Sequence, residues 1–188
     1  AFGDLIRAVE NGEVDILVGT QMVTKGLDFD SIGLVGIMSA DNLLSFPDFR
    51  ANERAFQLIE QVAGRTGRRT SKGKVVIQAM KPRHSIIQLA LNHDFSGMQA
   101  KELSIRKEYQ YPPFVRLITI TLKHRDQKLL QRAAGEFARS LRSKIGDRFL
   151  GPEFAPISRL KNLYQMQIIV KVDKGSIGAK VRERIKKS

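Results

Sequence analysis

The chain has 188 residues, a length that fits one large domain or two small ones. Hydrophobic residues make up 42% of the chain and charged residues 27%, which is an ordinary globular composition and excludes a disordered or collagen-like chain. The absence of cysteine excludes disulfide bonds, thiolate zinc sites and cysteine nucleophiles within the chain. No apolar run approaches the roughly 18 residues of a membrane span, and the first residues do not resemble a signal peptide, so no membrane partner is expected.

The 32 basic and 19 acidic residues give a net charge of +13, and this charge is unevenly distributed. Residues 1–100 carry 11 basic and 11 acidic residues, whereas residues 101–188 carry 21 and 8. This shift in composition predicts two domains, residues 1–100 and residues 101–188, and a polyanionic partner for the second. The alternative is a basic surface that serves only solubility.

Residues 1–100 show the alternation of helices and strands that is typical of an α/β fold. Apolar residues at helical spacing predict helices, and short apolar runs bounded by glycine predict buried strands. The expected helices cover residues 2–9, 50–66 and 85–91, and the expected strands cover residues 16–18, 32–38 and 74–79. Strands that alternate with helices pair in parallel, so we expect a parallel sheet with helices on both faces.

A polar segment from Gly19 to Phe29 directly follows the first expected strand. In parallel α/β folds, ligands bind beyond the carboxyl ends of the strands. The segment holds two glycines, two threonine hydroxyls, a lysine and an aspartate. Glycine lets backbone N–H groups approach an oxyanion, and an aspartate can accept a hydrogen bond from a ribose hydroxyl. Contact with phosphates and sugars is therefore one interpretation, and an ordinary strand-to-helix loop is the other.

A second polar segment, residues 61–68, reads Gln-Val-Ala-Gly-Arg-Thr-Gly-Arg. Spacings of four and three residues place Gln61, Arg65 and Arg68 on one helical face, away from the apolar stripe. Two guanidinium groups set among small residues match phosphate oxygens in a bidentate manner, which predicts a phosphate clamp. The alternative is a solvated basic loop that continues into residues 69–74.

Residues 101–188 predict a small α+β domain. The run Tyr-Gln-Tyr-Pro-Pro-Phe at residues 109–114 ends any helix and starts an extended segment. Alternating apolar residues predict strands around residues 118–122 and 166–172, and Asp126 is a candidate N-cap for the helix that follows it. With a basic helix expected over residues 181–187, the order strand, helix, extended loop, strand, helix fits a split βαβ sandwich.

The central helix of this half is expected to be amphipathic, with a basic face opposite its core stripe. The stripe comprises Leu130, Ala133, Ala134, Phe137, Leu141 and Ile145, and the basic face comprises Lys128, Arg132, Arg139 and Arg142. A solvated surface explains such a face as well as a binding role does.

The loop expected over residues 151–164 is more specific, because Arg159 and Lys161 supply two phosphate contacts beside Tyr164, a ring that could stack on a base. The three histidines, His84, His93 and His124, lie far apart in the sequence without a carboxylate or cysteine pattern. Surface or capping roles are therefore expected for the histidines, and no metal site is expected in the chain.

Together, residues 19–29 and 61–68 resemble motifs V and VI of superfamily 2 nucleic-acid helicases, in the order found in the second RecA-like lobe. Within that class, the chain resembles the primosomal replication-restart helicases, the PriA family. The similarity is carried by Gly19-Thr20-Gln21-Met22, Lys25-Gly26-Leu27-Asp28-Phe29, Ala40-Asp41, residues 46–51, residues 53–58, residues 61–65, Tyr111-Pro112-Pro113-Phe114 and residues 151–164. It therefore covers nearly the whole chain.

The resemblance implies that residues 1–100 are a second, partial RecA-like helicase lobe. Residues 101–188 are implied to be a basic, DNA-binding domain similar to a small-subunit ribosomal protein. In such an enzyme Arg65 and Arg68 are catalytic, because they reach toward the γ-phosphate of ATP, and Arg68 is the stronger candidate for the arginine finger. The implied nucleotide contacts are Gly26, Asp28 and Gln61. The implied DNA contacts are Thr20, Gln21, Lys25, Arg159, Lys161 and Tyr164.

ATP and Mg²⁺ are the implied cofactors, and zinc is implied in the full-length protein but not in this chain. The chain contains no G-x-x-x-x-G-K-[ST] motif and no Asp-Glu pair, which ATP hydrolysis needs. We therefore expect a C-terminal fragment that is inactive alone, with most of the nucleotide site on a missing first lobe and a last strand missing beyond residue 188. The implied partners are forked and single-stranded DNA, the acidic tail of a single-strand-binding protein and other primosome proteins. The implied location is the bacterial cytoplasm, at the nucleoid.

Two other functions compete with a replication-restart DNA helicase. The first is a non-enzymatic nucleic-acid-binding module, in which residues 1–100 are only a scaffold. Such a module has no need for Gln61, Arg65 and Arg68 on one face. The second is an RNA helicase, against which the Tyr111-Pro112-Pro113-Phe114 domain argues by resemblance.

Overall fold

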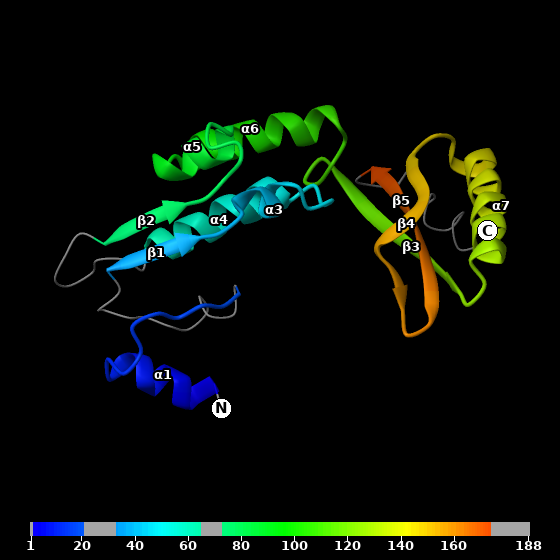
Figure 1. Cartoon of the computed structure of the whole chain (residues 1–188). Coiled ribbons are helices and arrows are strands. Elements are labelled where there is room, and N and C mark those ends of the chain that lie inside the picture. The colour runs from blue at the N-terminus through cyan, green and yellow to red at the C-terminus, as the bar shows by residue number, and fades with distance from the viewer. Residues whose placement is uncertain (1, 21–32, 65–72, 174–188) are drawn as a thin grey trace. The chain divides into compact units, whose positions relative to one another are not determined.

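A computed structural model describes residues 2–20, 33–64 and 73–173. The chain divides into two compact units, Ala1–Glu102 and Leu103–Ser188, which we call unit 1 and unit 2 and describe separately (Figure 1). Most of the sequence motifs assigned to nucleotide chemistry belong to unit 1. The excess of basic residues belongs to unit 2.

Unit 1 is an α/β unit with a two-stranded parallel sheet. Its elements are α1 (Phe2–Glu10), β1 (Leu34–Ile37), α3 (Ala40–Leu44), α4 (Ala51–Ala63), β2 (Lys74–Ile77), α5 (Ser85–Leu91) and the start of α6 (Phe95–Glu108), which contains the boundary with unit 2. The register pairs Leu34 with Lys74 and Ile37 with Ile77. The expected parallel pairing is confirmed, and α5 has the bounds that the sequence predicts. Helix α6 was not among the expected elements.

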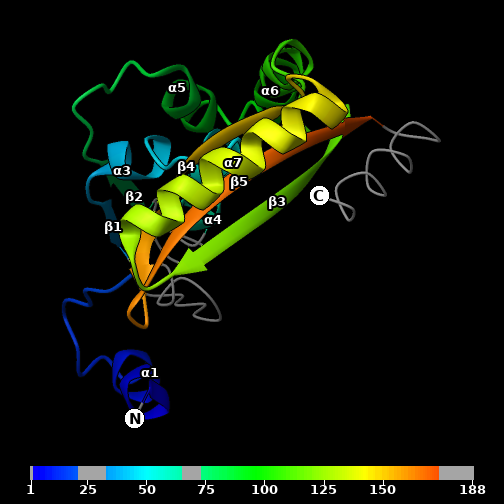
Figure 2. The ribbon, with the colours of Figure 1, turned by 90° about the vertical axis from the view of Figure 1, so that its right-hand side faces the viewer.

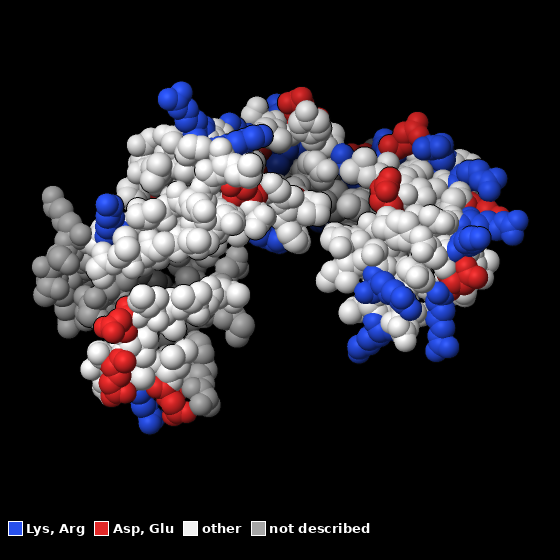
Figure 3. Space-filling model, viewed as in Figure 1, with Lys and Arg blue, Asp and Glu red and all other residues white. Residues whose placement is uncertain are grey.

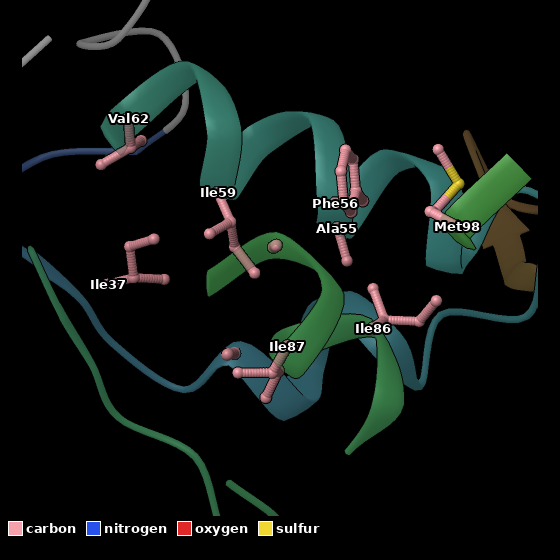
Figure 4. Close-up of a cluster of buried hydrophobic side chains, with 10 residues drawn as sticks. Ile37, Ala55, Phe56, Ile59, Val62, Ile86, Ile87 and Met98 are labelled. Carbon is pink, nitrogen blue, oxygen red and sulfur yellow. The ribbon is translucent and has the colours of Figure 1, made fainter. Parts of the chain in front are cut away.

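The core of unit 1 lies where one side of the sheet meets α4, α5 and α6 (Figure 4). The sequence predicts Ala55, Leu58, Ile59 and Val62 as the core stripe of α4. Ala55, Ile59 and Val62 are buried, and Leu58 is half-buried against the same core. Met98 contributes from α6. The first turn of α5 is capped by His84, whose Nδ1 accepts a hydrogen bond from the Ile86 amide at 3.3 Å. This is the capping role expected for that histidine.

The other face of the sheet is open among the described residues. Leu34 is 62% exposed and Val76 is 47% exposed, so the expected covering by helices on both faces is seen on one face only in the part of the chain that the structure describes. The strand predicted over residues 16–18 is wrong. Those residues have no regular structure, and Ile16 and Val18 are more than 80% exposed. A strand needs a neighbouring strand for its backbone hydrogen bonds, and no described segment pairs with this one.

Unit 2 is a three-stranded antiparallel sheet with one long helix. Its elements after the end of α6 are β3 (Val115–His124), α7 (Gln127–Ile145), β4 (Phe149–Leu160) and β5 (Leu163–Asp173). The strand order is β3-β5-β4, so the last strand lies between the two earlier ones and is antiparallel to both. This is the predicted split βαβ arrangement: β3 and β4 run in the same direction, and α7 connects them.

The core of unit 2 forms between α7 and one face of the sheet. Strand β5 alternates as predicted, with Ile168, Val170 and Val172 almost fully buried. In α7, Leu141 is fully buried, and the stripe includes Ala138 rather than Ala133, which is exposed. Ala138 continues the spacing of four residues from Ala134, so it lies at the centre of the buried face.

The predicted N-cap of α7 is confirmed, because the Asp126 carboxylate accepts a hydrogen bond from the Leu129 amide at 3.0 Å. The extended loop predicted over residues 151–164 is instead most of β4 and the hairpin that joins it to β5. Pro152 and Pro156 favour a loop in the sequence, but β4 lies at the edge of the sheet, where a residue without an N–H group is tolerated. The predicted helix over residues 181–187 lies outside the described residues.

Neither a membrane-spanning helix nor a metal-binding cluster is present in the described parts of the two units. Among the described residues, no helix has the length and apolar character that a membrane span requires. Within the same parts of the chain, no three His, Asp or Glu side chains gather in a way that could hold a metal ion.

Candidate functional site

The structure describes two of the residues predicted for the helicase motifs. Thr20 is exposed at the end of the first described segment, and Gln61 is exposed in the last turn of α4. Gln61 is exposed, whereas Ile59 and Val62 of the same helix are buried in the core. The Gln61 side chain is therefore on the side of α4 away from the core. The other predicted residues of these motifs lie outside the described residues: Gln21, Lys25, Gly26, Asp28, Arg65 and Arg68.

The start of α4 is held by Asp48, which lies in the turn before the helix. One Asp48 carboxylate oxygen accepts a hydrogen bond from the Arg50 amide at 2.9 Å, and the other pairs with the Arg54 guanidinium at 2.9 Å. The end of the helix is fixed by core packing of Ile59 and Val62. Helix α4 ends at Ala63, and residues 65–68, which follow it in sequence, lie outside the described residues.

Asp41 in α3 links this region to the end of β2. Its carboxylate accepts a hydrogen bond from the Met80 amide at 2.7 Å, which joins residues 39 positions apart. This hydrogen bond is the main reason that the pKa of Asp41 lies below its usual value, with smaller contributions from the Asp41 backbone and from Lys81. The ionised form of Asp41 thus fastens α3, immediately before α4, to the sheet.

The three predicted DNA-binding residues of unit 2 come together on the hairpin between β4 and β5. Arg159 and Tyr164 are cross-strand partners, and the Arg159 guanidinium carbon lies 5.1 Å from the centroid of the Tyr164 ring, within the range of a cation–π contact. Lys161 and Asn162 form the two-residue turn with φ values of 50° and 62°, as tight hairpins require. Lys161 is therefore exposed at the tip of the hairpin.

The Tyr164 ring contacts two groups of described residues in unit 2. One is the Arg159 guanidinium. The other is a small buried cluster of Leu130, Ala134 and Met166, against which the half-buried ring packs. Tyr164 therefore fixes the position of Arg159 on the surface of unit 2.

The sheet register brings more cations to the same end of unit 2. His124, the last residue of β3, pairs with Tyr164, so the corner between β3 and α7 lies beside the base of the hairpin (Figure 2). Six exposed cations lie at this corner, on the first turns of α7 and on the hairpin, and we call them the basic end: Lys123, Arg125, Lys128, Arg132, Arg159 and Lys161. Lys and Arg side chains also gather on this side of unit 2 in the space-filling view (Figure 3).

The sequence did not indicate Lys123 and Arg125 as site residues. Both are ordinary surface cations in sequence, and the pairing of β3 with β5 brings their backbone positions to the end of the sheet where Arg159 and Lys161 lie. The alternation of apolar and polar residues in β3 and β5 was predictable. The register in which these two strands pair, about 40 residues apart in sequence, is decided by packing.

Three cations toward the opposite end of unit 2, Arg142, Arg148 and Lys171, have partners within the unit. Arg142 Nε donates to Asp147 at 2.7 Å, and an Arg148 guanidinium N–H donates to Asp173 at 2.6 Å. Lys171 Nζ donates to the Tyr109 carbonyl oxygen at 2.7 Å and lies 4.6 Å from the centroid of the Tyr111 ring. Partial burial lowers the pKa of Lys171.

The basic end differs in this respect. Among the described residues, none of its six cations forms an ion pair with a carboxylate. The nearest acidic residue in sequence, Asp126, uses its carboxylate to cap α7. The dipole of α7 adds positive potential at its N-terminus, on the same side. The basic end is thus a surface of uncompensated positive charge, which is what a polyanion requires.

Comparison with known families assigns a class to each unit. Residues 3–70 match the helicase conserved C-terminal domain, and residues 107–188 match the primosomal protein N C-terminal domain. The chain thus has the fold expected from its motifs, a RecA-like helicase lobe followed by a second, smaller domain.

The relatives of the chain are more specific than these domain classes. The replication restart protein PriA of Bacillus subtilis (strain 168) is 41% identical over 169 residues, which are 89% of this chain and 21% of that protein. The same protein of a Synechocystis species is 42% identical over 171 residues, and that of Thermotoga maritima is 38% identical over 162 residues. The chain is therefore a relative of the replication restart protein PriA, and it spans about a fifth of the length of these relatives.

Proposed function

We propose that the chain supplies the second motor lobe and the C-terminal DNA-binding domain of an ATP-dependent DNA helicase that remodels stalled replication forks and so restarts replication. The observation that carries the proposal is the joint match, in this order, to a helicase C-terminal domain and a primosomal C-terminal domain. The curated relatives named replication restart proteins support it, because they match both units in one continuous alignment.

The proposed chemistry of unit 1 is the stabilisation of charge during phosphoryl transfer. Arg65 and Arg68 follow α4 in sequence, and the position of α4 is fixed by Asp48 and by the core. Their guanidinium groups bind a phosphate of the nucleotide. There they stabilise negative charge on the transferred group, as arginine fingers do. Gln61, exposed at the end of α4, orients the nucleotide.

The remaining helicase contacts are proposed for the segment after residue 19. Gly26 and Asp28 contact the nucleotide, and Thr20, Gln21 and Lys25 contact the DNA backbone. When bound, ATP supplies the phosphoryl group, and Mg²⁺ supplies positive charge to the phosphate oxygens. The exposed side chain of Gln61 is compatible with that ligand. Zinc belongs to the proposal only for the full-length protein: this chain has no cysteine, and its described His, Asp and Glu side chains form no metal-binding group.

The proposed partners follow from the same relationship. They are forked and single-stranded DNA, the acidic tail of a single-strand-binding protein and other primosome proteins, in the bacterial cytoplasm at the nucleoid. The charge of unit 2 supports an acidic partner in general. Coprecipitation of the chain with a peptide that has the acidic tail sequence, compared with a charge-scrambled peptide, tests the protein partner.

A chimeric enzyme tests the proposed motor function. In the B. subtilis relative, the matched 21% is replaced by this chain, and ATP hydrolysis is measured with and without forked DNA. We expect the chimera to show ATPase activity that forked DNA stimulates, and the isolated chain to show none. A chimera that folds and binds DNA but never hydrolyses ATP contradicts the proposal and favours the non-enzymatic binding module.

A further inference from the structure

The basic end of unit 2 combines cations from three separate segments on one rigid frame. Lys123 and Arg125 come from the end of β3 and the corner, Lys128 and Arg132 from the first turns of α7, and the last two cations from the hairpin. These segments are held together by the pairing of β3 and β4 with β5 and by the buried cluster around Leu130 and Met166. The backbone positions of the six cations are therefore set before any ligand binds.

The type of side chain at the basic end distinguishes between two kinds of nucleic acid. Proteins that bind single strands combine cations with exposed aromatic rings on which bases stack. The aromatic residues of this end are Phe154, which packs against the buried cluster, and Tyr164, whose ring carries Arg159. No described residue of the basic end offers a free ring. A surface of preset cations without a stacking platform suits the sugar–phosphate backbone of a duplex.

We infer that the basic end is the surface by which unit 2 binds double-stranded DNA, through its phosphates and without reading bases. Tyr164 acts as a positioning residue that presents the Arg159 guanidinium to a phosphate. The inference rests on the proposed function, which it deepens by naming the duplex arms of a fork, rather than its single strands, as the ligand of this surface.

The test measures binding of the whole chain to labelled DNA by fluorescence anisotropy. The probes are a duplex of about 20 base pairs and an oligothymidylate of about 20 nucleotides, each titrated between about 50 and 200 mM NaCl, because phosphate contacts are read from the salt dependence. We expect the duplex to bind about tenfold more tightly than the single strand at the same salt concentration.

The variant Arg125→Glu/Lys161→Glu changes two segments of the basic end. We expect it to weaken duplex binding at least about tenfold and to reduce the slope of log K against log salt by about 2, because two phosphate contacts are lost. Both residues are exposed, and thermal melting verifies that the variant is folded. The neutral variant Arg125→Gln/Lys161→Gln provides the same test without charge reversal.

The matched control is Arg116→Glu/Lys107→Glu, which changes net charge equally. Both residues are exposed and have no described carboxylate partner. Arg116 lies seven residues before Lys123 on β3, roughly 24 Å away at 3.4 Å per residue. Lys107 lies two residues before Tyr109, whose carbonyl oxygen accepts from Lys171 at the other end of unit 2. Since the Debye length is about 10 Å at 0.1 M salt, we expect this control to weaken binding less than about threefold.

Three results would overturn the inference. One is an equal loss of affinity in the control, which would make net charge the cause. A second is single-strand binding as tight as duplex binding and equally sensitive to the basic-end variant. The third is an unchanged affinity in that variant. The outcome is separable from the proposed motor function. A chimera whose ATPase is stimulated by forks, but whose duplex binding is unchanged by the basic-end variant, contradicts only the inference. Duplex binding that depends on the basic end, in a chimera without ATPase activity, contradicts only the motor function.

Discussion

The two units use charge in opposite ways. In unit 1 the described acidic residues mostly have assigned partners: Asp48 pairs with Arg54, Glu60 contacts His93 at 3.0 Å, and Asp41 accepts from Met80. In unit 2 the basic end leaves six cations without a described carboxylate. Charge therefore holds the elements of unit 1 in place, while much of the charge in unit 2 is available to a partner. The comparison shows that net charge becomes informative about function only when the ion pairs have been located.

The largest expected effect separates the two units by activity. In the chimera, Arg68→Ala removes the proposed finger of unit 1, and we expect ATP turnover to fall by about 10³-fold or more while ATP and DNA binding persist. Arg159→Ala in unit 2 should instead weaken duplex binding and leave turnover at saturating DNA within about twofold. Steady-state ATPase assays and anisotropy check both, and near-normal turnover of the Arg68 variant rejects its assignment.

The next effect concerns the stability of unit 2 alone. Gly151 in β4 has φ of +96°, and an added Cβ would lie 2.6 Å from the Gln167 carbonyl oxygen. We expect Gly151→Ala to destabilise unit 2 by about 2–4 kcal/mol, because both the backbone conformation and the close strand oppose a side chain. Gly135 in α7 has no atom within 4 Å of an added Cβ, so Gly135→Ala should stabilise the helix by about 0.5–1 kcal/mol.

Calorimetry and amide hydrogen exchange measure these two glycine variants. Exchange should rise in β3, β4 and β5 of the Gly151 variant and stay unchanged in α4 and α5, because each unit has its own core. A uniform rise across both units would show that the units unfold together and would weaken the comparison drawn above.

A smaller effect is expected at Asp126, which both caps α7 and lies at the basic end. Asp126→Ala should cost about 1 kcal/mol of stability because the Leu129 amide loses its acceptor. Asp126→Asn keeps a capping oxygen and removes the negative charge, so it should leave stability nearly unchanged and tighten duplex binding by about threefold or less. Chemical denaturation and anisotropy distinguish the two roles, and identical behaviour of the two variants would refute the separation.

The smallest effect is expected from the pH dependence of Asp41 in unit 1. Its pKa is lower in the folded chain, so the unfolded chain binds a proton more readily. The stability that Asp41 contributes is therefore fully present above the usual carboxylate value of 3.8 and is lost as pH falls through the lower folded value. We expect Asp41→Asn to remove this part of the acid sensitivity, measured as urea midpoints near pH 3 and pH 6. An unchanged difference between the two midpoints contradicts this role.

The elements that the sequence predicted correctly are those whose signals are local. Helix α5 and the Asp126 cap depend on residues within a few positions of each other, and the alternation in β5 reports a buried face wherever the strand lies. The wrong strand at residues 16–18 has the apolar composition of a strand but no partner among the described residues. Apolar composition indicates that a segment prefers burial, whereas a strand also requires a neighbouring strand for its backbone hydrogen bonds.

The structure also corrected predictions where position in the sheet outweighs local preference. Pro152 and Pro156 are compatible with β4 only because it is an edge strand, and the edge is set by β5 inserting on the other side. Helix α6 has few buried residues, Met98 and Glu102 among them, so no apolar stripe indicated it. The candidate DNA contacts on the hairpin were predictable as residue types, but the basic end required the register of β3 with β5.

The strand order β3-β5-β4 also has a consequence for biosynthesis. The ribosome makes β3, α7 and β4 first. Strands β3 and β4 do not pair with each other, and β5, which pairs with both, is made last. Until residues 163–173 have left the exit tunnel, β3 and β4 have unpaired edges. The apolar face of α7 then lacks the part of its core that β5 supplies. Unit 2 can therefore complete its fold only after nearly all of the described chain has been synthesised, and a nascent chain at that stage exposes the surfaces that chaperones recognise.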